Sequence, residues 1–276
     1  MASDAQIVWN GRLTMQMRRR ELLGALGAGL AGARFARAQT AQAAQAATRS
    51  LPVRKVKTTV LFKSPEGYPN ALAVSPEGLW IGEQKTDHAC LVDWNGKLLK
   101  TIATESKNTS GMAVGGGYVW MGANAAPNGI FQTDMSSKTI AHRQIPLGGG
   151  GCHGVEWVEG KLWIAALRLR GILRVDAQTW TPEFMIPYSV PRAHGTAFVR
   201  DSIWMVTGTD EGAGLIRYEI ETGRPVEVVT FADTNPDPHG LVWHDGALYS
   251  CDAGIHPGWP ENKSPTHGSI FRIDLL

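Results

Sequence analysis

Five stretches decide the fold: NALAVSPEGLW (70–80), SGMAVGGGYVW (110–120), HGVEWVEGKLW (153–163), HGTAFVRDSIW (194–204) and HGLVWHDGALY (239–249). In each, the first residue lies ten positions before a closing aromatic residue, and successive copies begin 40, 43, 41 and 45 residues apart. A repeat of this period, with several short strands in each unit, is typical of a β-propeller. We therefore expect five blades around a central channel.

Each unit contains four predicted strands. The first alternates apolar residues with others, as in HGVEW (153–157), and a turn leads to the second. The fifth unit ends after its third strand, and VRKVKTTVLF (53–62), ahead of the first unit, can supply the fourth. That pairing would join the two ends of the domain and remove a free strand edge. The sequence thus predicts an all-β fold, one β-propeller domain over 51–276 with five four-stranded blades.

The first fifty residues differ from the repeats. Arg18, Arg19 and Arg20 precede an apolar run that ends in a small-x-small signal at 36–38, which is the layout of a signal peptide over 1–38. The paired arginines indicate the twin-arginine export route. Residues 39–50 form a low-complexity linker. We expect a periplasmic or secreted protein without a membrane anchor.

Charge argues against a nucleic-acid partner. The whole chain has a net charge of +2, but residues 1–38 carry six basic and two acidic residues, so 21 basic and 23 acidic residues remain after cleavage. A domain without a basic surplus lacks the electrostatic footprint of a nucleic-acid-binding protein. We expect a small-molecule partner and, in the absence of heptads or an apolar stripe, a monomer.

Two rings of side chains are expected at one mouth of the channel. The first strand of each blade lines the channel, and the second returns to the same mouth. The first ring consists of Asn70, Ser110, His153, His194 and His239, and the second of Glu83, Ala123, Ala166, Thr207 and Asp252. Small residues follow the first ring in every copy and would let the inner strands crowd the axis: Ala71, Gly111, Gly154, Gly195 and Gly240.

Three convergent histidines suit a divalent metal. His153, His194 and His239 lie in consecutive blades, and neutral imidazole is a good ligand for zinc, iron or copper, with manganese a further candidate. Three protein ligands with a vacant position are typical of a catalytic site. The alternative is structural, since a histidine that starts an inner strand can bond a backbone group between blades.

Further candidates surround this mouth. Glu83 and Asp252 are candidate catalytic carboxylates, with strand capping as the alternative role. The long loop 253–268 carries His256, a third catalytic candidate, and Trp259, a candidate for substrate binding. Asn70 and Arg168 complete the predicted substrate site, with Arg168 as an anion clamp. The three cysteines, Cys90, Cys152 and Cys251, lack metal-site spacing and are interpreted as small buried residues.

The unit His-Gly-apolar…Gly-x-Leu-Trp resembles the repeats of streptogramin (virginiamycin B) lyases and the wider SMP-30/gluconolactonase-like propellers. This resemblance implies a divalent metal and a histidine base at the channel mouth, at positions matching His194 and His239, with Glu83 or Asp252 as acidic partner. Those lyases have seven blades and the SMP-30 group binds calcium through carboxylates and an amide, so this chain departs from both. Plant-type glutaminyl cyclotransferases share the five-blade count, but PNAL (69–72) and GEQ (82–84) lack their signatures.

The sequence therefore predicts a metal-dependent lyase or hydrolase. The expected substrate is a small lactone, ester or related carbonyl compound, bound at the histidine mouth. The metal would polarise the carbonyl or activate water, while Glu83, Asp252 or a ring histidine that is not a ligand moves the proton. The alternative is a non-enzymatic propeller that binds a small ligand or a protein at the same mouth.

Overall fold

The computed structural model describes residues 51–190, 193–209, 212–231, 236–253, 264 and 266–275. The predicted signal peptide and linker lie outside these residues, as do His256 and Trp259. Within the described part, no helix combines the length and the apolar character needed to cross a bilayer. What the structure describes is the predicted propeller domain.

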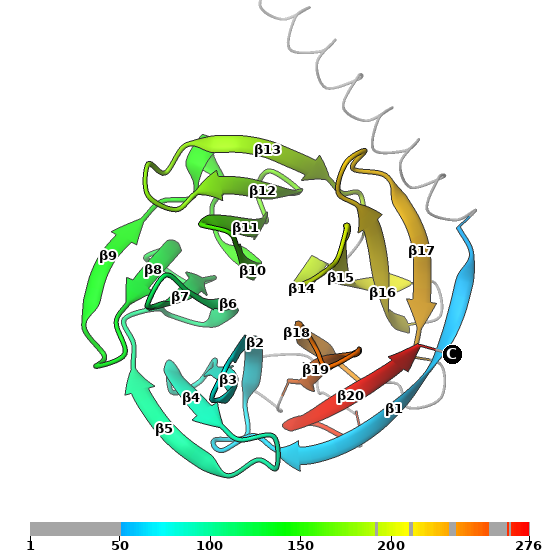
Figure 1. Cartoon of the computed structure of the whole chain (residues 1–276), viewed down its shortest axis with the longest axis horizontal. Helices are drawn as coiled ribbons and strands as arrows, with labels where there is room; N and C mark the ends of the chain where they lie inside the picture. Colours follow the sequence, from blue (N-terminus) through cyan, green and yellow to red (C-terminus); the bar gives the residue numbers. More distant parts are fainter. Residues whose placement is uncertain are drawn as a thin grey trace, which may run out of the picture. The chain divides into compact units, whose positions relative to one another are not determined.

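Twenty strands in the described residues form five blades around an axis (Figure 1). Blades 1 to 3 are separate four-stranded antiparallel sheets. Blade 1 contains β2 (Pro69–Ser75), β3 (Gly78–Glu83), β4 (His88–Val92) and β5 (Leu98–Ala103). Blade 2 contains β6 (Thr109–Gly115), β7 (Tyr118–Ala123), β8 (Gly129–Thr133) and β9 (Thr139–Arg143). Blade 3 follows a short 3-10 turn, η1 (Pro146–Gly148), and contains β10 (Cys152–Val158), β11 (Lys161–Ala166), β12 (Gly171–Asp176) and β13 (Pro182–Pro187).

The last two blades are joined through the first strand of the domain. Blade 4 contains β14 (Ala193–Val199), β15 (Ser202–Thr209), β16 (Gly212–Glu219) and β17 (Pro225–Thr230). Blade 5 contains β18 (Pro238–His244), β19 (Ala247–Asp252), β20 (Ser269–Leu275) and β1 (Val53–Lys63). The antiparallel pairing of β1 with β20 confirms the predicted closure. The first residues of β1 also pair parallel with β17, so blades 4 and 5 form one eight-stranded sheet. Figure 1 shows β1 on the outside of the ring, beside β20 and β17.

The apolar core lies between blades rather than at the axis. Five clusters of buried side chains each combine residues from two neighbouring blades. Each cluster contains one closing aromatic residue of the repeat, and all five aromatics are buried: Trp80, Trp120, Trp163, Trp204 and Tyr249. The repeated aromatic therefore fills the space between blades, which is why it recurs at a fixed distance from the channel.

The inner strands approach one another backbone to backbone, as the small residues predict. A Cβ atom on Gly195 would lie 2.4 Å from the His239 carbonyl oxygen of the next blade. On Gly240 it would lie 2.7 Å from the Leu72 backbone nitrogen. Contacts this short are not tolerated, so glycine is required where these strands meet.

We expect Val56→Ala to destabilise the domain by about 1.5–3 kcal/mol, because Val56 is the one fully buried side chain of β1 and packs into the blade 4–blade 5 core. Denaturant unfolding followed by tryptophan fluorescence measures the change. Val60→Ala is the matched control, since Val60 lies on the same strand but is 48% exposed, and we expect a change within about 0.5 kcal/mol. Equal effects of the two substitutions would show that β1 closes the ring through its backbone alone.

Candidate functional site

One mouth of the channel carries three adjacent imidazoles. His153, His194 and His239 are the second residues of the first strands of blades 3, 4 and 5. The rings of His153 and His194 stack with centroids 4.2 Å apart, and the edge of one ring meets the other between His194 and His239 at 4.3 Å. His239 and His194 are buried, while His153 is half-buried. The structure thus brings together the three histidines that the repeat singled out.

A bulge in every blade accompanies this ring. The pairing of the first with the second strand slips by one residue beside each ring position. Bulges of this kind re-aim a side chain and strengthen the local twist. Because the bulge recurs in all five blades, the ring residues share one level around the axis.

The hydrogen-bond partners of His153 determine which of its ring nitrogens carries the hydrogen. Its Nδ1 lies 2.7 Å from the carbonyl oxygen of Ala193, which can only accept, so Nδ1 carries the hydrogen. Its Nε2 lies 2.7 Å from Nδ2 of Asn124, which can only donate, so Nε2 presents a lone pair. His153 is therefore held as a neutral ring whose basic nitrogen points to an amide.

The hydrogen-bond partners of His239 favour a protonated, positively charged ring. Asn70 donates from Nδ2 to the Thr109 carbonyl at 2.9 Å and to Oγ of Ser110 at 2.8 Å, so its Oδ1 accepts from Nδ1 of His239. On the other side of the ring, Nε2 of His239 lies 3.3 Å from Oδ2 of Asp237. Two acceptors, one of them a carboxylate, suit an imidazolium ion. Asn70 thus orients a histidine, and its contact with a substrate stays a prediction.

The three histidines are not arranged as ligands of one metal. Stacked rings at an angle of 20° do not direct their nitrogens at a common point, and His153 and His239 use their nitrogens in the bonds just described. Among the described residues, no three His, Cys, Asp or Glu side chains are placed to hold a metal ion. The present arrangement therefore does not fit a three-imidazole centre. The metal predicted from the sequence would need these rings to reorient, and no step below is routed through a metal.

Glu83 holds a loop. It is fully buried at the end of β3 and accepts hydrogen bonds from the backbone N–H groups of Tyr68 (2.8 Å) and Glu66 (3.3 Å). Burial raises the pKa of Glu83 above its ordinary value, against the lowering effect of these hydrogen bonds. These contacts suit the capping role that the sequence left open.

Asp252 likewise holds a loop, in the neighbouring blade 5. It is fully buried at the end of β19, and its Oδ2 accepts from the hydroxyls of Ser264 and Thr266. The loops that the two acids hold touch each other, since Ser64 N–H donates to the Gly268 carbonyl at 2.9 Å. The predicted adjacency of Glu83 and Asp252 therefore takes the form of two loops in contact, and their catalytic role stays a prediction.

Arg168 lies beside a glycine run at the border of blades 2 and 3. It is exposed, its backbone N–H donates to the Gly149 carbonyl, and its side chain lies against Gly150. Gly151 in turn packs against Asn124, the partner of His153. The predicted anion clamp is thus joined to the half-buried histidine by three consecutive glycines.

Sequence reasoning missed Asn124 and Asp237. Asn124 directly follows the second-ring position Ala123, and Asp237 lies two residues before His239. Both stand outside the repeated positions, so the repeat alone gives no signal for them. Cys152, the residue before His153, is buried as predicted, and burial raises the pKa of its thiol to about 12.

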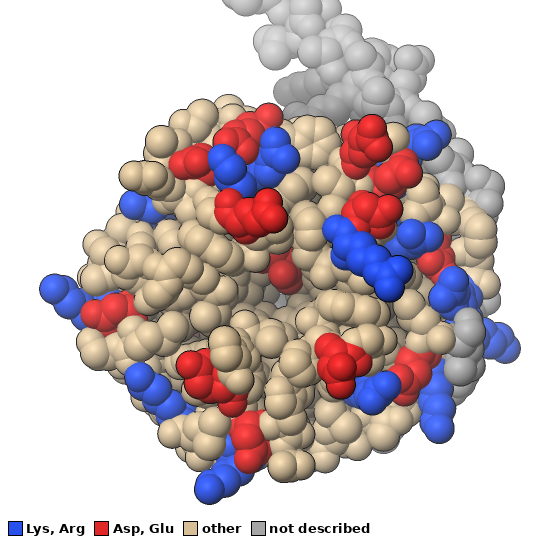
Figure 2. Space-filling model, viewed as in Figure 1, with Lys and Arg blue, Asp and Glu red and all other residues tan. Residues whose placement is uncertain are grey.

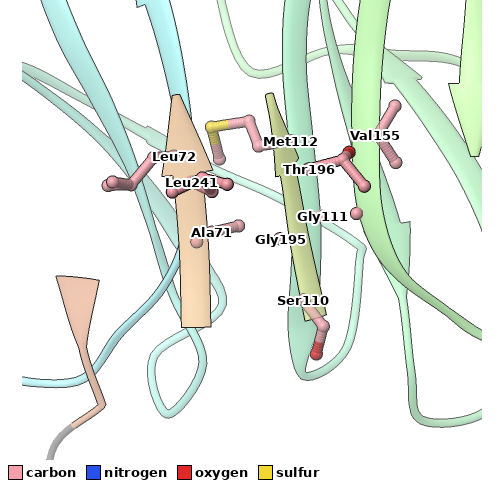
Figure 3. Close-up of a pocket in the computed structure, with 11 residues that line it drawn as sticks. Ala71, Leu72, Ser110, Gly111, Met112, Val155, Gly195, Thr196 and Leu241 are labelled. Carbon is pink, nitrogen blue, oxygen red and sulfur yellow. The ribbon is translucent and has the colours of Figure 1, made fainter. Parts of the chain in front are cut away.

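The channel is closed beneath the histidines. Figure 3 shows the side chains there, with Ser110 at one end and Met112 and Thr196 towards the other. The space between them is too small for a water molecule. The closing layer is formed by one residue from each blade: Leu72, Met112, Val155, Thr196 and Leu241. A ligand at the histidine mouth therefore cannot pass along the axis.

No family model and no curated protein sequence matches the chain. Solved structures do resemble it. A glutaminyl cyclase from Myxococcus xanthus superimposes with a TM-score of 0.62 at 10% identity, over 82% of this chain and 98% of that one. The calcium-binding protein regucalcin from Agrobacterium tumefaciens gives 0.54 at 13% identity, over 81% and 95%. Virginiamycin B lyase from Staphylococcus aureus gives 0.47 at 18% identity, over 77% and 68%. At these identities the first two show a shared propeller fold, and the third carries no argument.

We expect the purified protein to hold no stoichiometric metal, because both ring nitrogens of His153 and of His239 are engaged in hydrogen bonds. Elemental analysis of the full chain, after incubation with zinc, iron, copper or manganese and dialysis, measures the content. A His153→Ala/His239→Ala double variant is the comparison. About one ion per wild-type chain and none in the variant would contradict this expectation and support a metal site formed by the three histidines.

We expect Glu83→Gln to destabilise the domain by about 1–3 kcal/mol, because an amide cannot accept both backbone N–H groups. The raised pKa of Glu83 means that its contribution is present at low pH and lost as the pH rises through the folded-state pKa. The advantage of the wild type over the variant should therefore shrink as the pH is raised above the ordinary pKa of 4.5. Urea unfolding over a series of pH values above 4.5, with exposed Glu105→Gln as control, tests this, and an advantage that grows with pH would contradict it.

Proposed function

We propose that the protein is an exported enzyme that opens a small lactone, ester or related carbonyl compound at the histidine mouth, as a hydrolase or a lyase. One observation carries the proposal: His153 is half-buried, neutral, and presents the lone pair of Nε2 to the amide of Asn124. A neutral imidazole is the usual general base of proteins near neutral pH, and here its basic nitrogen becomes available when the Asn124 amide turns to another acceptor.

His153 would act as the base in either reaction. In hydrolysis, Nε2 takes a proton from water while the water oxygen bonds to the carbonyl carbon, and the ester C–O bond then breaks. In elimination, Nε2 takes a proton from the carbon next to the one bearing the ester oxygen, a C=C bond forms, and the carboxylate leaves. In both cases the proton on His153 is then returned, to the leaving alkoxide or to solvent.

Asn124 couples proton uptake to charge stabilisation. Its Nδ2 donates to Nε2 of His153 only while that nitrogen is unprotonated. Once His153 has taken the proton, the Asn124 N–H must find another acceptor. The negative oxygen that develops on the substrate at that moment is such an acceptor, and a well-placed donor to it is worth on the order of 100-fold in rate.

The other two histidines are positioning residues in this proposal. His239, held by Asn70 and Asp237, packs edge to face with His194, and His194 stacks on the ring of His153. Buried as they are, they fix the plane of the base without touching the substrate. Arg168, exposed beyond the glycine run, would pair with a substrate carboxylate.

We expect His153→Ala to lower kcat/KM at least about 100-fold, because the general base is removed. The wild type is first screened against a panel of lactones and esters, with product formation followed by mass spectrometry. His142→Gln is the control, because His142 is exposed on the outer strand β9 and lies outside the ring. Asn124→Ala should lower kcat more than it raises KM, since its contact to the substrate strengthens in the transition state.

Two outcomes would overturn the proposal. The first is turnover that survives His153→Ala. The second is a wild-type protein that turns over no member of the panel but binds one of them at this mouth, with an affinity that falls in the Asn124→Ala variant. That result would favour the non-enzymatic binding propeller.

A further inference from the structure

The opposite mouth of the channel holds a second cavity. Each inner strand runs from its ring residue, past the closing layer, to a turn at the other end. The third and fourth residues after the ring position therefore lie at the far mouth, about 10–13 Å along the strand. A cavity of about 240 Å³ opens there, lined by residues from all five blades.

One residue breaks the pattern of this mouth. The third position after the ring is small or apolar in four blades and acidic in the other: Ala73, Ala113, Glu156, Ala197 and Val242. Among the described residues that line the cavity, Glu156 is also the one titratable side chain. Figure 2 shows acidic atoms in the central opening of the visible face, with uncharged surface immediately around them, which agrees with this composition. A carboxyl group is not needed to build this strand, since the other four blades do without it.

The other described side chains that line the cavity are apolar or aromatic. The fourth position after the ring supplies Trp157, Phe198 and Trp243 in blades 3, 4 and 5. Trp157 stacks on Trp120 with centroids 5.5 Å apart, and its ring occupies the place where a Cβ of Gly115 would be. Phe198 packs at a tilt against Trp163 at 5.1 Å. These contacts hold the aromatic rings in place before any ligand arrives.

Few groups around Glu156 offset the cost of burying its carboxylate charge. The nearby backbone N–H of Phe198 acts to lower the pKa of its carboxyl group, and no other described residue that lines the cavity is titratable. Burial raises the pKa of Glu156 well above its ordinary value of 4.5. Its side chain is only half-buried, so a ligand can reach it from outside.

We propose that this second mouth binds a small organic cation, namely an amine carried on an aromatic or branched aliphatic body. The ammonium group would pair with the Glu156 carboxylate, which then recovers a counter-charge in an apolar site. The faces of Trp157 and Trp243 would add cation–π attraction, and the apolar walls would cover the body of the ligand. A neutral ligand of the same shape would still be covered by the apolar walls. It would gain neither the charge pair with Glu156 nor the cation–π attraction.

The site is separate from the histidine mouth. The layer formed by Leu72, Met112, Val155, Thr196 and Leu241 leaves no room for water between them. The proposal therefore does not depend on the function proposed above, and binding at Glu156 should be unchanged in the His153→Ala variant.

Benzylamine is the probe, and benzyl alcohol is its neutral counterpart. Isothermal titration calorimetry on the full chain should show saturable binding of benzylamine and at least tenfold weaker binding of the alcohol. Glu156→Gln keeps the size of the side chain and an acceptor for the Phe198 N–H, so we expect it to fold and to lose at least tenfold in benzylamine affinity. Glu159→Gln, exposed three residues later, is the matched control and should bind as the wild type does.

The pH dependence distinguishes a charge pair from simple burial of the aromatic ring. Because the cation binds only the ionised carboxylate, wild-type affinity should rise with pH until Glu156 is ionised, with proton release at lower pH. The Glu156→Gln variant should show no such rise. If Glu156→Gln does not fold, Val74→Phe, which narrows the rim and leaves Glu156 in place, should abolish binding instead. Equal affinity for amine and alcohol, unchanged affinity in Glu156→Gln, or no binding to the wild type would each overturn the proposal.

Discussion

The structure depends on backbone-to-backbone contact among the five inner strands. Gly111, Gly154, Gly195 and Gly240 each lie so close to the next blade that a Cβ atom would come within 3.0 Å of it. Only Ala71, in blade 1, has a side chain at this level. This crowding holds the first residues of neighbouring strands at one height and a few ångströms apart. The imidazole stack is a direct result, because ring centroids 4.2–4.3 Å apart require strands that nearly touch.

The same crowding gives the channel two mouths of opposite chemistry. At one mouth, polar side chains satisfy one another in a belt that runs from Asn124 through the histidines to Asn70 and Ser110. At the other, a single carboxyl group stands among aromatic and aliphatic walls. Between them lies an apolar layer without room for water. A propeller with wider strand spacing would have a continuous water-filled channel and would expose both ends to the same solvent.

The fold could be predicted from the repeats because every blade packs against its neighbour in the same way. The closing aromatic lies between blades and the small residue lies at the axis, so both recur at fixed spacing and both could be predicted. The pairing of β1 with β17 could not, since it depends on how far β1 extends past β20. The protonation of the histidines could not be predicted either, because Asn124 and Asp237 lie in loops that carry no repeat. Glu156 carries a signal in the sequence, a charge at a repeat position that is otherwise small or apolar, but the predictions drew only on the ring positions and not on this one.

The double pairing of β1 has a consequence for the order in which the chain can fold. This strand is the first of the domain to be synthesised, and both of its partners, β17 and β20, come from the last quarter of the chain. Until those partners exist, Val53, Val60 and Leu61 belong to an unpaired strand edge of the kind that nucleates aggregation. Contacts between such distant parts of a chain also form slowly. The ring therefore closes only when β1, the first strand of the domain, pairs with β17 and β20 near its end. Almost the whole domain is synthesised before this pairing can form.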